Sequence, residues 1–298
     1  MTALKTATVF PEIHTRKHQS NELPENHYRY SSMHKEIANC LLMLREQQPV
    51  VHNITNQVVM NNTANALLAI GASPIMAHAA EEVEEMVSLA GALVINTGTI
   101  TSYQVSSMVL AIEKANELGK PWILDPVGAG ATTFRLNMNR ELLQLKPTVV
   151  RGNASEILSV LAGEASGKGV DSIHDSSSTL GTIQHSAAEL GIVMAVTGAV
   201  DYVTDGKRLA AISNGHPMMA KVTGTGCSAT AVTGAFLATC EDPWLASLSS
   251  LSCMGIAGEV AVEASKGPGS LQMHLLDQLF LLNESVIRNR LQLNLESY

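Results

Sequence analysis

The residues best suited to chemistry form the stretch Val222–Cys227, Val-Thr-Gly-Thr-Gly-Cys, and a run of small and apolar residues, Ser228–Ala238, follows it directly. Two glycines around a threonine let the backbone turn so that successive N–H groups point at one spot. The apolar run predicts a buried helix that starts at this turn. Together they predict a phosphate-type anion site at a helix N-terminus.

Cys227 falls in the first turn of that helix. The positive end of the helix dipole lowers the pKa of a thiol there, so we expect thiolate to be available near neutral pH. Cys227 is therefore a candidate base or nucleophile beside the phosphate site. Cys40, Cys240 and Cys253 show no Cys-x-x-Cys pairing and no nearby histidine array, so we expect buried apolar side chains, no zinc site, no disulfide framework and a cytoplasmic protein.

Polar residues also follow each of five predicted strands. In chain order they are Asn53 and Asn56, Asn96–Thr99, Asp125–Gly130, Arg151–Glu156, and Thr197–Gly198. In open sheets of parallel strands, ligands bind beyond the carboxyl ends of the strands. An arginine, two carboxylates and several amides and hydroxyls suit a polyphosphate and its metal. Arg151 fits phosphate oxygens, and Glu156 or Asp125 fits Mg²⁺, held directly or through water.

Each of these residues also has a simpler interpretation. Asp125 can end a strand and cap the following turn. Asn153–Glu156 fits a helix N-cap with the acid at the third helical position, and Thr197–Gly198 fits a turn. Met76 would ordinarily fill a core, and His52 fits a strand end as well as a functional site. The set therefore carries more weight than any single member.

Apolar runs alternate with helical segments along the chain. The expected strands are 49–52, 92–96, 122–125, 148–151 and 192–197, and the expected helices include 61–70, 106–118 and 176–190. This alternation predicts an α/β fold with a mostly parallel sheet that is covered on both faces. Residues 202–204 and 209–212 flank Asp205–Arg208, which predicts an antiparallel hairpin at the sheet edge. Arg288–Tyr298 carries weaker signals of a final helix or an appendage.

Composition bounds the function class. The chain has 298 residues, 46% hydrophobic, 15% charged and 4% aromatic, which is typical of an enzyme-like domain with a large core. A net charge of -8 without a basic cluster argues against nucleic acid and against an anionic membrane as partners. We find no run of roughly 18 apolar residues that would span a membrane. Residues 1–33 are expected to form a polar, disordered head, and residues 34–298 a single domain.

Six short motifs occur in a defined order: His52–Asn56, Asn62–Asn65, Gly71–Pro74, Leu124–Gly130, Arg151–Glu156 and Gly224–Cys227. From about His34 to about Leu282, this order resembles the hydroxyethylthiazole kinase family of the ribokinase-like superfamily. The resemblance implies a ribokinase-like fold and transfer of the ATP γ-phosphate to the primary alcohol of 4-methyl-5-(2-hydroxyethyl)thiazole with Mg²⁺, in thiamine salvage. It also implies a homotrimer with substrate sites between subunits.

By position, the resemblance implies roles on the alcohol side of the site. Met76, Asn56 and Gly224 would contact the thiazole or its hydroxyethyl arm. Cys227 departs from the wider superfamily, which usually has aspartate at the end of this glycine-rich turn. Either group can take the alcohol proton, and phosphoryl transfer through a loose transition state depends mainly on positioning and charge neutralisation. A weak base is therefore sufficient.

On the nucleotide side, the resemblance implies that Arg151 and Thr197 bind ATP and that Asp125 and Glu156 serve the metal and phosphates. The nucleotide half would look similar in a pyridoxal kinase, a hydroxymethylpyrimidine kinase or an ADP-dependent dehydratase. Cys227 and the segment Ser73–Ala77 favour the thiazole. Two other classes stay open: a cysteine hydrolase, for which no histidine partner motif is recognisable, and a non-catalytic nucleotide-binding module.

Overall fold

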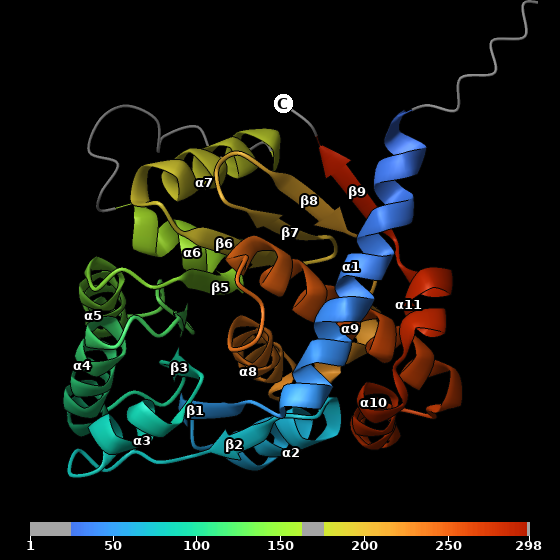
Figure 1. Ribbon diagram of the computed structural model, residues 1–298. Helices are drawn as coiled ribbons and strands as arrows, with labels where there is room; N and C mark the ends of the chain where they lie inside the picture. Colours follow the sequence, from blue (N-terminus) through green and yellow to red (C-terminus); the bar gives the residue numbers. More distant parts are fainter. Residues whose placement is uncertain (1–24, 163–175, 297–298) are drawn as a thin grey trace, which may run out of the picture.

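The computed structural model describes residues 25–162 and 176–296. Its centre is a nine-stranded sheet in the order β2-β1-β3-β4-β5-β6-β7-β8-β9, seen in Figure 1. The strands from β2 to β6 in that order pair in parallel. Each of β7, β8 and β9 pairs antiparallel with the strand before it in the order. The strands are β1 Val50–Ile54, β2 Ser73–Ile75, β3 Ala92–Asn96, β4 Trp122–Asp125, β5 Val149–Asn153, β6 Val193–Thr197, β7 Asp201–Thr204, β8 Leu209–Ile212 and β9 Leu293–Glu296.

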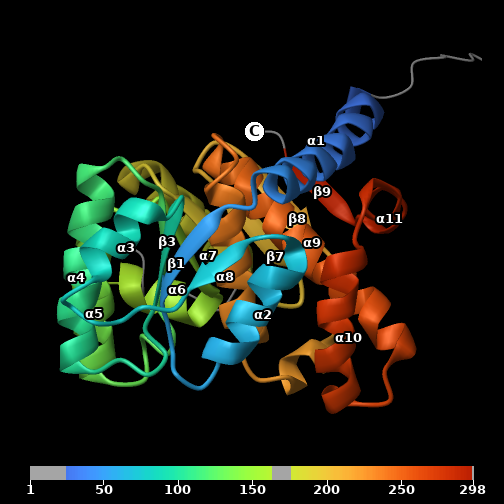
Figure 2. The ribbon, with the colours of Figure 1, turned by 60° about the horizontal axis from the view of Figure 1, so that its bottom comes forward.

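Helices cover both faces of the sheet and bury two apolar clusters (Figures 1 and 2). One cluster joins the sheet to α1 Glu25–Gln47, α2 Met60–Ile70, α8 Thr225–Leu237, α9 Pro243–Ala264, α10 Pro268–Leu281 and α11 Glu284–Arg290. The other joins it to α3 Val83–Leu89, α4 Ser102–Glu117, α5 Thr133–Gln144, α6 Ala154–Leu161 and α7 Ser176–Leu190. A short 3₁₀ helix, η2 Pro217–Lys221, leads into α8.

Small residues let α8 lie directly on the sheet. A Cβ added at Gly234 would come within 2.6 Å of Val94 on β3 and within 3.2 Å of Val51 on β1. Only a residue without a side chain fits so close to two strands. The composition of Ser228–Ala238 thus brings the N-terminus of α8 to the carboxyl ends of these strands.

Helix α9 is the next layer outward. It is 22 residues long and apolar enough by length and composition to cross a membrane, whereas the sequence analysis predicted no such segment. In the structure 78% of its most apolar window is buried inside the protein. Packing against α8, α10 and the sheet therefore accounts for its composition.

The expected parallel strands and the edge hairpin are confirmed, and two strands were not predicted. β2 has only three residues with a central proline, which suits an edge strand. Arg288–Tyr298 was expected to be a final helix or an appendage, whereas α11 ends at Arg290 and β9 pairs with β8. Helix α1 begins at Glu25, so the expected boundary at residue 33 falls inside a helix; residues 1–24 of the expected head lie outside the described residues.

We predict that Gly234→Ala destabilises the protein by about 1–3 kcal/mol, because the added methyl group overpacks the contact of α8 with β1 and β3. Urea denaturation measures this free energy of unfolding. Gly181→Ala is the matched control: Gly181 lies exposed in α7 with nothing within 4 Å of its added Cβ. That variant should gain up to about 1 kcal/mol from helix propensity, and equal effects at the two positions would contradict the packing argument.

Candidate active site

The glycine-rich turn meets the strand ends as the sequence predicts. Gly224 has φ 85° and N-caps α8, and a Cβ there would come within 2.6 Å of Val59. Both the left-handed backbone and the close approach require glycine. Helix α8 begins at Thr225, so Cys227 lies in its first turn.

Asp125 is the carboxylate at the centre of this site. It ends β4 and is 1% exposed. Its Oδ2 accepts hydrogen bonds from Asn96 Nδ2 at 2.7 Å and from Thr230 Oγ1 at 2.7 Å. Burial raises the pKa of Asp125 to about 6, although the charge of Arg151 and the bond from Thr230 oppose the rise. Neighbouring strands and α8 thus hold a carboxyl group that titrates near neutral pH.

Cys227 is close to Asn56, whose Nδ2 lies 3.5 Å from the Cys227 sulfur. Burial raises the pKa of the Cys227 thiol to about 11, and the nearby charge of Asp125 adds to the rise. Asn96 and Arg151 lower the pKa only partly. The expectation of a lowered pKa at Cys227 is therefore wrong, because desolvation and a neighbouring carboxylate outweigh the helix dipole.

Arg151 and Thr197 come together at the ends of β5 and β6. Arg151 Nη2 donates to Thr197 Oγ1 at 2.8 Å, and the guanidinium packs so closely on the turn that a Cβ at Gly226 would lie 3.0 Å from Nη1. Arg151 is only 9% exposed, and its Nε has no hydrogen-bond partner among the described residues. A buried guanidinium with spare donors at a helix N-terminus suits an anionic ligand.

A cavity of about 550 Å³ opens beside this pair. Its polar lining includes Arg151, Thr197 and Gly226, and its apolar lining includes Leu251 and Met254 of α9. Asp201, at the start of β7, also lines it. Burial raises the pKa of Asp201 to about 6, opposed by the Gly198 N–H and by Arg151. The cavity combines a cationic, donor-rich side with an apolar one.

Glu156 forms the N-cap arrangement that the sequence allowed. Its Oε2 accepts from Asn153 N at 3.0 Å, while Asn153 Oδ1 accepts from Glu156 N at 2.9 Å. The same carboxylate reaches the loop after β4, where Oε1 accepts from Gly128 N at 2.9 Å. The charge of Glu156 also raises the pKa of Asp125. Glu156 is therefore both a helix cap and a second negative charge at the site.

These two carboxylates fit a magnesium ion that shares its coordination with phosphates. No group of three or more His, Cys, Asp or Glu side chains that could hold a metal occurs in residues 25–162 and 176–296. Mg²⁺ commonly uses one or two carboxylates, water and substrate phosphates, so a full protein cage is not required. Both of the hydrogen bonds to Asp125 described above go to Oδ2, which leaves Oδ1 as the candidate ligand atom.

The proposed thiazole contacts lie on different segments. Asn56 is 9% exposed beside Cys227, whereas Met76 follows β2, half-buried against the apolar cluster of α2 and α8. His78 connects the two segments, because its Nδ1 donates to the carbonyl of Met76 at 3.0 Å and its Nε2 accepts from the N–H of Thr55 at 3.2 Å. Gly224 borders a small separate cavity with Asn62 and Gln272. Asn56 and Cys227 thus belong to one site within the chain.

Sequence reasoning missed three residues that shape the site. Thr230 lies three residues after Cys227, a spacing that places both on one face of α8. Asp201 begins the edge hairpin directly after Thr197–Gly198. Arg135, on α5, donates to the carbonyls of Thr97 at 2.6 Å, Gly98 at 2.7 Å and Val127 at 3.0 Å. It therefore ties together the loops that follow β3 and β4.

His52 proves to be structural. It is fully buried, and its Nε2 donates to the carbonyl of Ala77 at 3.0 Å, which links β1 to the segment after β2. Burial lowers the pKa of His52, so the ring is neutral near pH 7.

Comparison with known proteins decides the family. The model of the hydroxyethylthiazole kinase family matches residues 41–285. The chain belongs to this family. It is 53% identical over 255 residues to hydroxyethylthiazole kinase of Pyrococcus horikoshii, covering 85% of this chain and 96% of that protein. It is 50% identical over 249 residues to hydroxyethylthiazole kinase of Granulibacter bethesdensis, covering 84% of this chain and 91% of that protein.

Solved structures of related proteins support the same family and fold. The structure of the Pyrococcus horikoshii hydroxyethylthiazole kinase protein superimposes with a TM-score of 0.83 at 49% identity and covers 88% of this chain and all of that chain. Pyridoxal kinase from Staphylococcus aureus in complex with ADP gives a TM-score of 0.52 at 16% identity, covering 68% and 85%. That second likeness concerns the ribokinase-like fold, which is confirmed.

We predict that Asp125→Asn raises the melting temperature at pH 7. Because the folded-state pKa of Asp125 lies above its unfolded value, the folded protein binds this proton more tightly, and the free energy of unfolding falls as pH rises from about 4 to about 6. Removing the titration should recover on the order of 2–3 kcal/mol above pH 6 and little at pH 4.

Thermal unfolding from pH 4 to pH 8 tests this, with Glu113→Gln as the control because Glu113 is an exposed carboxylate on α4. A gain from Asp125→Asn that is the same at pH 4 and pH 8 would contradict the argument.

Proposed function

We propose that the protein transfers the γ-phosphoryl group of ATP to the primary alcohol of 4-methyl-5-(2-hydroxyethyl)thiazole, a step of thiamine salvage. The observation that carries this proposal is the meeting of Asp125, Arg151 and Cys227 at the N-terminus of α8, next to a cavity of about 550 Å³. Family membership supports the reaction and its substrate. The free thiols of all four cysteines fit the cytoplasmic location that we propose.

ATP would lie with its phosphates toward the first turn of α8. Arg151 offers charge-assisted hydrogen bonds, and the backbone N–H groups of the glycine-rich turn offer the positive end of the helix dipole. The apolar Leu251 and Met254 suit the base. Thr197 orients the Arg151 guanidinium.

Asp125 and Glu156 are the residues that would hold Mg²⁺. When bound, the ion neutralises charge on the β- and γ-phosphates. Burial raises the pKa of Asp125 because the positive charge nearby does not fully stabilise the ionised carboxylate. A bound cation would favour the ionised form. Asn96 and Thr230 hold Asp125 Oδ2 in place.

Cys227 is the group that we propose takes the alcohol proton. With a pKa of about 11, Cys227 is almost entirely protonated at neutral pH, and a protonated thiol cannot accept a proton. Only its small thiolate fraction takes the alcohol proton, so the rate by this route rises with pH. A loose phosphoryl-transfer transition state develops little nucleophile charge early, which makes positioning more important than basicity. Asn56, in contact with the sulfur, would orient the hydroxyethyl arm.

The raised pKa also weighs against the cysteine hydrolase alternative. A covalent cysteine nucleophile needs a thiolate at working pH, usually with a lowered pKa and a histidine base. Cys227 has neither the lowered pKa nor a hydrogen bond from histidine among the described residues. The kinase proposal therefore accommodates the Cys227 environment better.

An ADP-release assay on the purified full-length protein tests the function. The thiazole alcohol, pyridoxal and hydroxymethylpyrimidine are supplied separately with ATP and Mg²⁺, and the product is identified by mass spectrometry. We expect phosphorylation of the thiazole alcohol with the highest kcat/KM. Preference for another alcohol would reassign the substrate, and nucleotide binding without turnover would favour a non-catalytic module.

We predict that Cys227→Ala lowers kcat by roughly 10- to 10⁴-fold, the range for a lost general base, and leaves ATP affinity nearly unchanged. Cys227→Asp should retain activity because a carboxylate accepts the same proton. The kcat of the native enzyme should rise toward alkaline pH, and that of Cys227→Asp should level off at lower pH. A covalent substrate adduct on Cys227 during turnover would contradict the base role.

Arg151→Ala should weaken ATP binding by about 1.5–3 kcal/mol, because it removes a charge-assisted contact to phosphate. Glu156→Gln should instead raise the Mg²⁺ concentration required for half-maximal rate, since glutamine keeps the helix cap and removes the charge. Separate titrations of ATP and Mg²⁺ distinguish the two. Unchanged constants in both variants would leave Glu156 as a helix cap alone.

We further propose a homotrimer in which Met76 of one subunit completes the site of the next. The family resemblance implies this assembly. Asn56 does not need a neighbour, because it contacts Cys227 in its own chain.

Mixed trimers test the shared site. Inactive Met76→Glu mixed with inactive Cys227→Ala should recover part of the activity, because some interfaces combine two intact halves. Asn56→Ala mixed with Cys227→Ala is the matched control and should recover none. Recovery in the control, or none with Met76→Glu despite proven subunit exchange, would refute the arrangement, as would a fully active monomer in sedimentation.

A further inference from the structure

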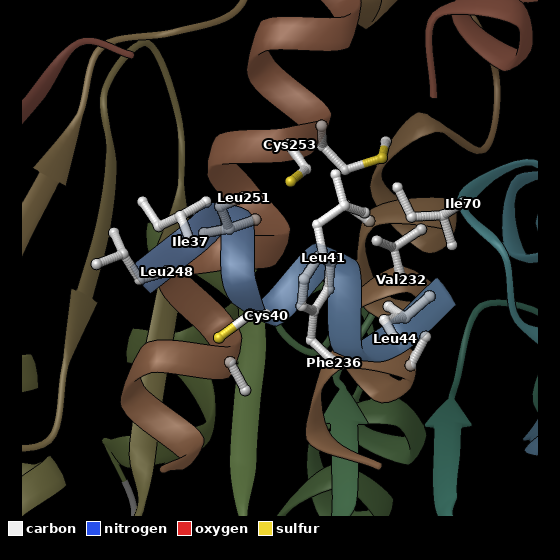
Figure 3. Packing of buried hydrophobic residues seen from close by; sticks show 14 of the residues in the cluster. Ile37, Cys40, Leu41, Leu44, Ile70, Val232, Phe236, Leu248, Leu251 and Cys253 are labelled. Atoms are coloured by element: carbon white, nitrogen blue, oxygen red, sulfur yellow. The ribbon is translucent and has the colours of Figure 1, made fainter. Parts of the chain in front are cut away.

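Two cysteines far apart in sequence have their sulfurs side by side. Cys40 lies in α1, and Cys240 lies in the short connection between α8 and α9. Their Sγ atoms are 3.7 Å apart. Figure 3 shows Cys40 at the edge of the apolar cluster that includes Phe236 and Leu248. None of the motifs of the proposed reaction includes either residue.

The pair lies at the opposite end of the sheet from Cys227. Cys240 is half-buried and lines a second cavity, of about 440 Å³, with Pro121 and Thr148. Those two residues precede β4 and β5, so this cavity is at the amino ends of the parallel strands. Cys40 is 5% exposed and lies behind Cys240. A small solute in the cavity reaches the Cys240 sulfur first.

The two thiols also differ in acidity. A hydrogen bond from Cys240 lowers the pKa of Cys40 to about 7 and outweighs its burial. The pKa of Cys240 is raised by the same contact. The contact therefore favours the thiolate form of Cys40, which is the form that attacks an oxidised sulfur.

We propose that Cys40 and Cys240 are an oxidative modification site, at which a small peroxide drives formation of a reversible disulfide. Hydrogen peroxide reacts with the thiolate form of Cys240, the cysteine that lines the cavity. One peroxide oxygen bonds to the sulfur as the O–O bond breaks, and the other leaves as hydroxide, which takes up a proton and becomes water. The Cys40 thiolate then attacks the Cys240 sulfur and forms the S–S bond. The leaving hydroxide takes a proton from solvent. In total two thiols are oxidised and one peroxide is reduced to two waters.

The approach needed is small. A disulfide has an S–S distance of about 2.05 Å, so the sulfurs must close by roughly 1.6 Å. Cys240 lies between the end of α8 and the N-cap of α9 at Asp242, and its sulfur would have to give up only a long contact, at 3.5 Å, with the Asp242 carbonyl. The bond would join α1 to the connection between two core helices and close a loop of about 200 residues, which restricts the unfolded chain.

The other two cysteines do not have this arrangement. Cys253 is fully buried on α9, and burial holds its pKa near 12. Cys227 contacts Asn56 at the other end of the sheet, where the charge of Asp125 helps to raise its pKa. Each is therefore a built-in comparison for thiol oxidation in the same protein.

The experiment uses full-length protein treated with hydrogen peroxide, alkylated under denaturing conditions and digested without reductant. Cleavage after Lys35 and Arg45 releases the Cys40 peptide, and cleavage after Glu241 separates Cys240 from Cys253. The Cys227→Ser background leaves Cys240 as the only cysteine between residues 222 and 241. We expect a linked Cys40–Cys240 peptide that has lost two hydrogens and is restored by dithiothreitol.

The linkage should form at a rate independent of protein concentration and should raise the melting temperature by several degrees. Cys40→Ser and Cys240→Ser should each abolish both effects, while Cys227→Ser keeps them. A Cys40–Cys253 link, a chain-to-chain disulfide, or sulfinic acid on Cys240 without a cross-link would overturn the proposal. So would complete recovery of both free thiols after exposure to excess peroxide.

Discussion

The burial of Asp125 beneath the first turn of α8 is the constraint on which the rest of the site depends. A carboxylate at 1% exposure loses its hydration, and Asn96 and Thr230 replace only part of it. Because the lost hydration is replaced only in part, the pKa of Asp125 is raised to about 6. Arg151, the helix N-terminus and a cation on phosphate would each favour the ionised carboxylate. The site is therefore arranged to gain stability from the ligand that it is proposed to bind.

Placing a helix N-terminus over a buried carboxylate requires backbone to approach backbone. Gly234 lets α8 lie on β1 and β3, Gly224 lets the turn pass Val59, and Gly226 leaves room for the Arg151 guanidinium. Behind α8, a Cβ at Gly255 of α9 would lie 2.9 Å from Asn214, which lines the cavity beside Arg151. These glycines set the distances in the site, so the small-residue composition of α8 and α9 is a condition for the chemistry as well as for packing.

The sequence predicts the strands and the residues at their ends because both depend on local pattern. Apolar runs of suitable length, each followed by polar residues, place Asn96, Asp125 and Arg151 at one edge of a parallel sheet. Strand β2 was not predicted because Ser73–Ile75 is short and contains a proline, and because its pairing with β1 depends on tertiary contacts. Thr230 and Asp201 escaped because their roles arise only when α8 and β7 are brought against β4 and β6.

The four cysteines show why charge state is the hardest property to predict. A helix N-terminus lowers the pKa of a thiol, and Cys227 occupies one, yet burial and Asp125 reverse the sign. Cys40 has no such position, yet a second thiol from residue 240 lowers its pKa. In both cases the deciding neighbour is distant in sequence, at 125 or 240. Local sequence fixes which group is present, whereas the long-range packing of α1, α8 and the sheet fixes which form of that group is available to react.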